Sequence, residues 1–489
     1  MGLRHDLRLL ADAGIITGPI ATWPVAWPQV AADLAAMDES AKYPPAVSAA
    51  LARVRWRVST NQHESHARAG VYARGGSDPL FLRSFADTPR AEFEAGVFVD
   101  WMSGHLAGRI QLGYAHDPAE RAQERPPIPA GASLPPDFIS YEAPDGQEFR
   151  PDGSWIGVVM GNWMLSAGWM DRHWGPGWRG SLILSNNARP RPGITLRRLR
   201  TDAFKTPWLS WLGPWQFTTF VERLETDRTV RRALVWGMRI AIRPFESLEI
   251  GFSRTEMFGG EGRHVGFDTV VNVLTGQTTE SNPAVGSAEQ INGLGGGDIR
   301  WNLPWIDAAL YGEFIGEDEK GSRPDLIMSQ GGIAFWGGFG DAGASWRLVF
   351  ERVDTRAALF GANETDDGGD GVAYNNHDFA TGYRYRGRAI GYPADGDALL
   401  SSMRAIFVTA GGHVLTLSAA TGEVNRTDGP VRFRNALTPR NEQIDVIDLA
   451  YNHLFRWGGL TLGLGYTQRD FEGGDKDQAH AWLGYSRAF

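Results

Sequence analysis

Residues 93–114 read FEAGVFVDWMSGHLAGRIQLGY, and this stretch decides the fold. Apolar or small side chains occupy every second position from Phe93 to Trp101 and again from Leu106 to Tyr114, with mostly polar residues or glycine between them. A two-residue period is that of a β-strand with unlike faces, because successive side chains point to opposite sides. The stretch therefore predicts two antiparallel strands joined by a tight turn at residues 102–105.

The same period recurs at residues 236–242, 248–252, 346–350 and 460–466. A soluble β-sandwich also alternates, so the period alone leaves two fold classes open. Strands of about ten residues, aromatic side chains near strand ends and an alternating C-terminus that ends at Phe489 favour a membrane barrel. That C-terminus resembles the terminal strand of bacterial outer-membrane barrels, which the outer-membrane assembly machinery reads, although Arg487 departs from the usual pattern.

Short and long connections alternate along the chain, as in outer-membrane barrels with short periplasmic turns and long extracellular loops. Counting from residue 54 gives about eighteen antiparallel strands, and only a long periplasmic link at residues 201–213 breaks the alternation. We therefore predict an all-β transmembrane barrel over residues 54–489, facing the lipids of the outer membrane. Long loops are expected near residues 75–90, 116–153, 173–192, 258–297, 354–400 and 424–442.

Residues 1–53 have a helical period instead. Leu3, Leu7 and Leu10 share one helix face, and further helices are expected from Pro28 and from Pro44 or Pro45. Three short helices bury little area alone, so we expect this bundle to plug the periplasmic end of the barrel. No apolar signal region opens the chain, which is expected to be the mature form of a bacterial outer-membrane protein.

The composition of the 489 residues limits the function. Only four lysines occur, so arginine supplies nearly all the positive charge, and the formal net charge of −9 argues against a nucleic-acid partner. The absence of cysteine excludes disulfides, thiol catalysis and cysteine metal sites. No apolar run approaches the ~18 residues of a membrane-spanning helix, so strands must make any membrane crossing.

The candidate binding site lies at residues 168–198, GWMDRHWGPGWRGSLILSNNARPRPGITLRR. The Gly-Pro-Gly turn at 175–177 presents tryptophans as stacking platforms, and nearby arginines and asparagines offer donors to sugar hydroxyls and carboxylates. The alternative is that these residues only fold the segment back into the barrel mouth. The candidate glycan-binding residues are Arg172, His173, Trp174, Trp178, Asn186, Asn187, Arg189 and Arg191.

Two motifs resemble a known family, the Wzi capsule-assembly proteins of the bacterial outer membrane. They are LRHDLRLLADAGIITGPIATWPVAW at residues 3–27 and GNWMLSAGWMDRHWGPGWRGSLILSNNARPRPGITL at residues 161–196. The resemblance implies an eighteen-stranded barrel closed at its periplasmic end by an N-terminal helical bundle. It also implies a lectin-like role, tethering capsular polysaccharide to the cell surface, with no enzyme activity. We expect a capsular or extracellular polysaccharide as the partner, and neither a cofactor nor a metal.

Other functions remain open from the residues alone. A substrate-specific diffusion channel would line its lumen with Arg109, Arg239 and Arg347, and paired carboxylates in the lumen would permit a glycan-cleaving enzyme. His63 and His66 fit a metal site poorly, because residues three apart on a strand face opposite sides. The oxygen-rich loop at 363–371, which includes Asp366 to Asp370, lacks the EF-hand order and is better interpreted as a solvated acidic loop than as a calcium site.

Overall fold

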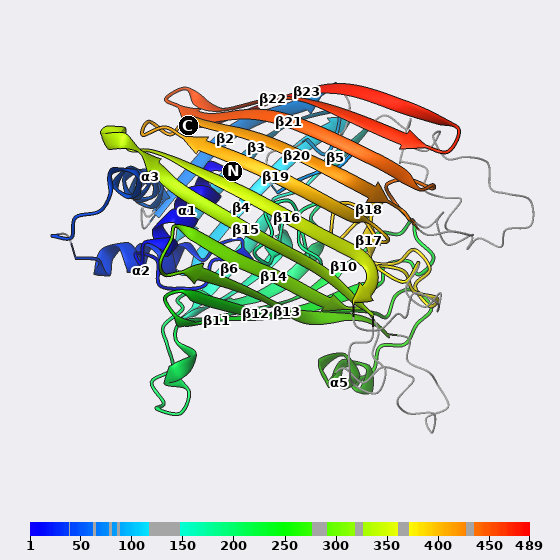
Figure 1. Cartoon of the computed structure of the whole chain (residues 1–489). Coiled ribbons are helices and arrows are strands. Elements are labelled where there is room, and N and C mark those ends of the chain that lie inside the picture. Colours follow the sequence, from blue (N-terminus) through cyan, green and yellow to red (C-terminus); the bar gives the residue numbers. More distant parts are fainter. Residues whose placement is uncertain are drawn as a thin grey trace, which may run out of the picture.

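A closed antiparallel β-barrel makes up most of the chain in the computed structural model (Figure 1). The structure describes residues 1–38, 40–61, 65–77, 81–85, 89–116, 147–275, 291–317, 326–359, 371–426 and 435–489. Within them, nineteen strands form the wall, but β5 (Gln147–Arg150) and β6 (Trp155–Met160) pair with successive parts of β4 (Leu106–His116). These two share one crossing, so the wall has eighteen crossings and the predicted barrel is confirmed.

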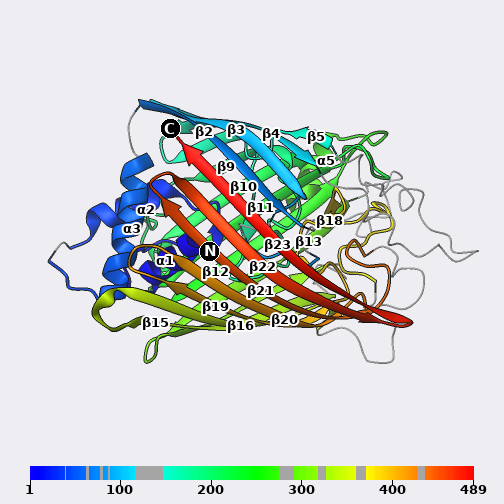
Figure 2. The ribbon, with the colours of Figure 1, turned by 90° about the horizontal axis from the view of Figure 1, so that it is seen from above.

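The barrel closes where β2 (Ser65–Gly76) pairs with the last strand, β23 (Gly474–Ala488), and Figure 2 shows the two side by side. The predicted hairpin is present as β3 (Phe93–Ser103) and β4. The other crossings are β7 (Trp163–Trp169), β9 (Pro192–Arg198), β10 (Trp215–Arg223), β11 (Leu234–Phe245), β12 (Leu248–Phe258), β13 (Ile291–Leu303), β14 (Ala308–Gly316), β15 (Ile327–Phe339), β16 (Ala344–Leu359), β19 (Leu399–Val408), β20 (Val414–Val424), β21 (Glu442–Phe455) and β22 (Gly458–Phe471).

The wall carries charged side chains inside and apolar side chains outside, the reverse of a soluble protein. On β12, Phe252 is 58% exposed, whereas Glu249 on the opposite face is 5% exposed. On β16, Phe350 is 41% exposed and Arg347 is 1% exposed. Soluble monomers rarely leave so broad an apolar surface in water, whereas a barrel that crosses a bilayer places it against lipid.

The helices that precede the wall are α1 (Gly2–Asp12), α2 (Trp27–Ala36) and α3 (Pro45–Asn61). Because α3 runs past residue 53, the expected change from helix to strand at that point is wrong. Val54, Trp56 and Val58 alternate as in a strand, which explains the error. Val54 and Val58, four residues apart on one helix face, are 0% and 8% exposed, whereas Trp56 is 52% exposed. Burial therefore follows the helical period here.

The helices α2 and α3 lie at one end of the barrel and the β17–β18 region (residues 384–389) lies at the other (Figures 1 and 2), and we call these ends the helical end and the loop end. At the helical end, α3 packs on η4 (Gly340–Ala342), the short turn between β15 and β16. The long link that contains η2 (Ser210–Leu212) also lies there, because the backbone N–H of Thr201 donates to Gln29 of α2 at 2.6 Å. Among the described residues, no helix is both long and apolar enough to cross a membrane.

Three segments of the chain lie inside the barrel. α1 lies inside the helical end, where Arg8 pairs with Glu249 of β12 at 3.0 Å. Two further segments, most of whose residues are buried, lie between α1 and the loop end. They are residues 170–191 and residues 371–398. The first segment contains β8 (His173–Trp174), which pairs with β1 (Thr22–Trp23), and the second contains the hairpin of β17 (Arg384–Tyr385) and β18 (Arg388–Ala389).

Candidate functional site

The segment that was predicted to carry the site does not continue to the rim of the barrel. The flanking strands β7 and β9 have seven residues each and pair along their whole length, whereas β21 and β22 have 14 each. Strands this short end partway up the wall, so residues 170–191 turn into the lumen and return. The expectation of an exposed loop at residues 173–192 is therefore wrong.

Both tryptophans of the expected stacking platform are buried. Trp174 is 1% exposed and Trp178 is 3% exposed. The Trp174 ring packs on Phe220 of β10 with centroids 5.3 Å apart, and the guanidinium groups of Arg4 and Arg347 lie 4.6 and 5.6 Å from the centroid of Trp178. An indole enclosed in this way has no free face for a sugar ring, so the exposed platform is absent.

The Gly-Pro-Gly turn permits close packing in the lumen instead. A Cβ atom at Gly177 would collide with the carbonyl oxygen of Gly180 and the side chain of Gln330. A Cβ atom at Gly180 would collide with Pro393 of the second lumen segment. Gly175 has a φ of 132°, which L side chains rarely adopt. These glycines therefore let the segment lie directly against the wall and against residues 371–398.

Arg172 and Arg191 are buried and share one wall carboxylate. The side chain of Glu222 on β10 is 0% exposed and accepts from Arg172 Nε at 2.8 Å and from Arg191 Nε at 2.7 Å. Two charge-assisted bonds to one carboxylate fix both ends of residues 172–191 to the same strand. These two candidate residues therefore have protein partners.

Two further wall carboxylates bind the backbone of the same segment. Glu351 on β16 accepts the N–H groups of residues 178 and 179 at 2.6 and 3.0 Å. Glu313 on β14 accepts from the Ser181 hydroxyl at 2.8 Å and from the N–H of residue 182 at 3.1 Å. Unpaired buried N–H groups cost free energy, so these acids satisfy the groups of a segment that has little regular structure.

His173 and Asn187 also have structural partners inside the lumen. His173 Nε2 lies 3.0 Å from the carbonyl oxygen of Gly177, and Asn187 Nδ2 donates to the carbonyl oxygen of Ala389 at 2.9 Å. Burial, with a contribution from Arg4, lowers the pKa of His173 well below its usual range. His173 is therefore neutral at physiological pH and links the two arms of the turn.

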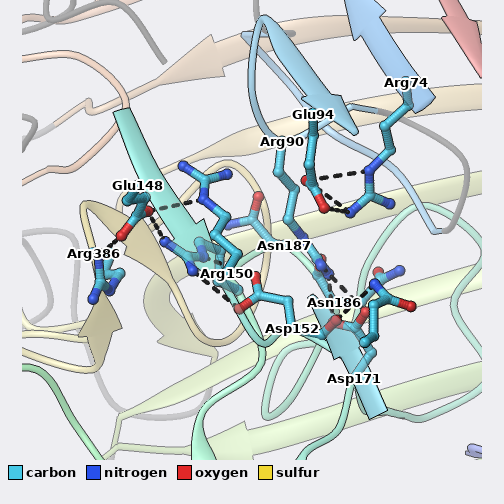
Figure 3. A network of polar contacts seen from close by, with 12 residues as sticks. Arg74, Arg90, Glu94, Glu148, Arg150, Asp152, Asp171, Asn186, Asn187 and Arg386 are labelled. Atoms are coloured by element: carbon cyan, nitrogen blue, oxygen red, sulfur yellow. Dashed lines mark hydrogen bonds and ion pairs between the residues drawn. The ribbon is translucent and has the colours of Figure 1, made fainter. Parts of the chain in front are cut away.

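The remaining two candidates, Asn186 and Arg189, contact an ionic network, part of which Figure 3 shows around Arg90, Glu148 and Asp152. Arg189 Nε donates to Asp152 at 2.8 Å, and its Nη1 atom also pairs with Glu148. The carbonyl oxygen of Asn186 accepts from Arg90 at 2.9 Å. This network, unlike the rest of the segment, meets solvent.

We call this set of ionic side chains the mouth network. Arg90 pairs with Asp171, whose side chain is 49% exposed, and Arg386 pairs with Glu148 at 3.0 Å and is 33% exposed. Within the part of the chain that the structure describes, the network contains seven arginines and four acids, so the formal charge of these members is 7 − 4 = +3, whereas the whole chain carries −9. Its members are Arg74, Arg83, Arg90, Arg150, Arg189, Arg386, Arg388, Glu94, Glu148, Asp152 and Asp171.

Several arginines of the network lie close to one another around Arg83. Burial lowers the pKa of Arg83 well below its usual range, and the neighbouring Arg90 and Arg388 lower it further. Apart from Arg189, the sequence did not single these residues out. Their positions offered the one sequence clue, since Arg74 and Arg90 lie at the ends of the predicted long loop 75–90 and Arg150 lies within the predicted loop 116–153.

The residues expected to line a diffusion channel bind the lumen contents or the wall. Arg239 pairs with Asp298 and donates to Thr22 of β1 at 2.9 Å. Arg347 pairs with Asp12 of α1 at 3.0 Å. Arg109 pairs with Asp100 at 3.3 Å on the neighbouring strand. Two of the three thus hold segments that lie in the lumen.

The metal candidates cannot be placed in this structure. His63 and residues 363–370 lie outside the described residues, as does the side chain of His66. In the described ranges, no three or more histidine, aspartate and glutamate side chains gather as a metal site would require.

Comparison with known proteins identifies close structural relatives. A family model described as capsule assembly protein Wzi matches residues 77–481. A 55.8 kDa protein of the cps region of Klebsiella pneumoniae is 29% identical over 367 residues, which cover 73% of this chain and 64% of that relative. The structure of Wzi of Escherichia coli, described as a carbohydrate-binding outer-membrane β-barrel involved in group 1 capsule assembly, matches with a TM-score of 0.78. The identity is 25%, and the match covers 100% of this chain and 98% of that one.

Proposed function

Because the chain belongs to the Wzi family of capsule assembly proteins, we propose that it binds capsular or extracellular polysaccharide at the bacterial cell surface and holds it there without chemical turnover. The description of its Escherichia coli relative as a carbohydrate-binding outer-membrane barrel supports this proposal. The observation that carries it is the mouth network, a set of arginines of which Arg74, Arg386 and Arg388 are partly exposed to solvent.

The proposal places the helical end in the periplasm and the loop end outside the cell. Short turns at one end and long connections at the other support this orientation, because outer-membrane barrels have that asymmetry. The apolar outer wall supports contact with outer-membrane lipids. The terminal Phe489, which is 68% exposed, supports recognition by the outer-membrane assembly machinery.

In this proposal, the mouth network contacts acidic groups of the glycan. Arginine pairs with carboxylates through a planar fork of donors, and Arg74 and Arg386, whose side chains are 35% and 33% exposed, can meet a chain that lies across the mouth. Of the residues predicted from the sequence, Asn186 and Arg189 take part at the mouth. The other six support it from below, namely Arg172, His173, Trp174, Trp178, Asn187 and Arg191.

The test is retention of an acidic polysaccharide by the protein in lipid nanodiscs, compared with a variant that carries Arg386→Gln and Arg388→Gln. Each partly exposed arginine should contribute about 1 kcal/mol to binding, so the double variant should bind roughly 30-fold more weakly. Because the contacts are ionic, wild-type binding should also weaken as salt rises.

The matched control carries Arg200→Gln and Arg456→Gln, two exposed arginines at the helical end. It should bind as the wild type does. Equal loss in both double variants, or no loss in the first, would contradict a binding site at the mouth.

A further inference from the structure

The helix α5 (Phe267–Thr275), in the connection between β12 and β13, exposes its apolar side. Its apolar side chains recur at i, i+3, i+4 and i+7, the stripe by which a surface helix normally packs on a core. Here that stripe is open, with Phe267 81%, Val270 43%, Val271 37% and Leu274 56% exposed. A stripe of this size needs a cover that the described chain does not supply.

A different side of α5 packs on the outside of the barrel wall. Thr269 and Val273 are each 3% exposed, and Val273 clusters with outward-facing side chains of β11, β12 and β13. These are Trp236, Phe258 and Ile291. Figure 1 shows α5 beside the ends of β11 to β13, at the loop end.

α5 therefore has three faces. At 100° per residue, Thr269 and Val273 point to the wall, and the apolar stripe is centred roughly 130° from them. The third face, roughly 115° from the stripe, carries the polar residues Asp268, Asn272 and Thr275. A helix with one face on protein, one apolar face and one polar face fits a boundary between lipid and water.

The height of α5 on the wall matches that boundary. Nine residues of β11 separate Trp236, which lies under the helix, from Phe245, which is 66% exposed at the helical end. At about 3.4 Å per residue and a tilt of ~40°, this is about 23 Å along the barrel axis. The apolar band of an outer-membrane barrel is about 25 Å tall. The helix thus lies at the outer edge of the band.

We propose that α5 is an interfacial helix whose stripe Phe267, Val270, Val271 and Leu274 inserts into the acyl-chain layer of the outer leaflet. The stripe lies on the same outer side of the wall as Phe252 of β12, which is 58% exposed, and the Arg254–Glu256 ion pair lies between the helix and this residue. Lipid is therefore the occupant that the surrounding surface already has. The proposal rests on the outer-membrane location proposed above, and it adds an anchor that holds residues 259–275 against the membrane.

The test uses single cysteines, which are unique labelling sites because the chain has no cysteine. Nitroxide labels at Phe267→Cys and Leu274→Cys are compared with one at Asp268→Cys, the matched control on the polar face of the same helix. Power-saturation electron paramagnetic resonance in phosphatidylethanolamine and phosphatidylglycerol vesicles measures the access of each label to oxygen and to a water-soluble nickel chelate.

The labels at 267 and 274 should favour oxygen and the label at 268 should favour the chelate. Equal chelate access at all three positions would overturn the proposal, and so would concentration-dependent spin–spin broadening at 274, which would indicate a second copy on the stripe. A label at Phe252→Cys distinguishes a failure of the proposed membrane location from a failure of the proposed anchor. If it also reports water, the membrane location fails, whereas a lipid signal there with water at 267 refutes only the anchor.

Discussion

Replacing Glu222 with glutamine should release the lumen segment from the wall. In the wild type, this carboxylate is completely buried and accepts from Arg172 at 2.8 Å and from Arg191 at 2.7 Å. The amide keeps the shape of the side chain but removes its charge. Two guanidinium groups, 3% and 4% exposed, would then remain in the lumen without this counter-charge.

Breaking a buried ion pair by removing one partner costs about 3–5 kcal/mol. A loss of about 3 kcal/mol in the local opening free energy corresponds to a roughly 150-fold rise in amide hydrogen exchange. Exchange measured by mass spectrometry in residues 170–191 should rise by that factor in Glu222→Gln. The control Glu423→Gln removes a carboxylate that is 41% exposed and pairs with Arg426, so exchange should change little. Unchanged exchange in Glu222→Gln would refute the anchoring of this segment by Glu222.

Three other predictions concern the segments inside the barrel. In planar bilayers the wild type should show no steady open current, because α1 and the two lumen segments occupy the interior, and a stable open current would contradict this. Burial lowers the pKa of His5 and His173 well below the usual range, so only the unfolded chain gains their protons and stability should fall below pH ~6.5. Below that pH, the free energy of unfolding from thermal melts should fall by about 1.4 kcal/mol per pH unit for each histidine. This pH dependence should flatten in a variant with both histidines changed to glutamine. Gly180→Ala should cost about 1–3 kcal/mol of stability through its collision with Pro393, whereas Gly411→Ala, whose Cβ would meet its nearest atom at 3.7 Å, should be neutral.

The wall of the barrel could be predicted because strand alternation is local information. Residues 93–114 already contain both faces and the turn of their hairpin. The same reasoning failed at Val54, Trp56 and Val58, where alternate apolar residues also satisfy a helix with one exposed tryptophan. Only the packing of α3 distinguishes the two, and a short sequence window does not contain it.

The position of the lumen segment could not be predicted, because its partners are distant in sequence. The sequence around Trp174 and Trp178 is compatible with an exposed turn and with a buried one, so it does not distinguish the two. Their burial depends on Glu222, Glu313 and Glu351, which reach the segment only when the register of three separate strands is fixed. The mouth network likewise joins residues as far apart as Arg74 and Arg388, so their shared positive charge emerges only in the folded barrel.

The most direct test of polysaccharide binding at the mouth compares one acidic polysaccharide with the same polymer after its carboxyl groups have been reduced to alcohols. Binding to the protein in nanodiscs is measured for both polymers by calorimetry at low salt. Arginine forks at the mouth predict clear binding of the acidic polymer and a large loss on reduction. Equal affinity for the two polymers, or no binding of either, would contradict the proposed recognition of an acidic glycan by the mouth network.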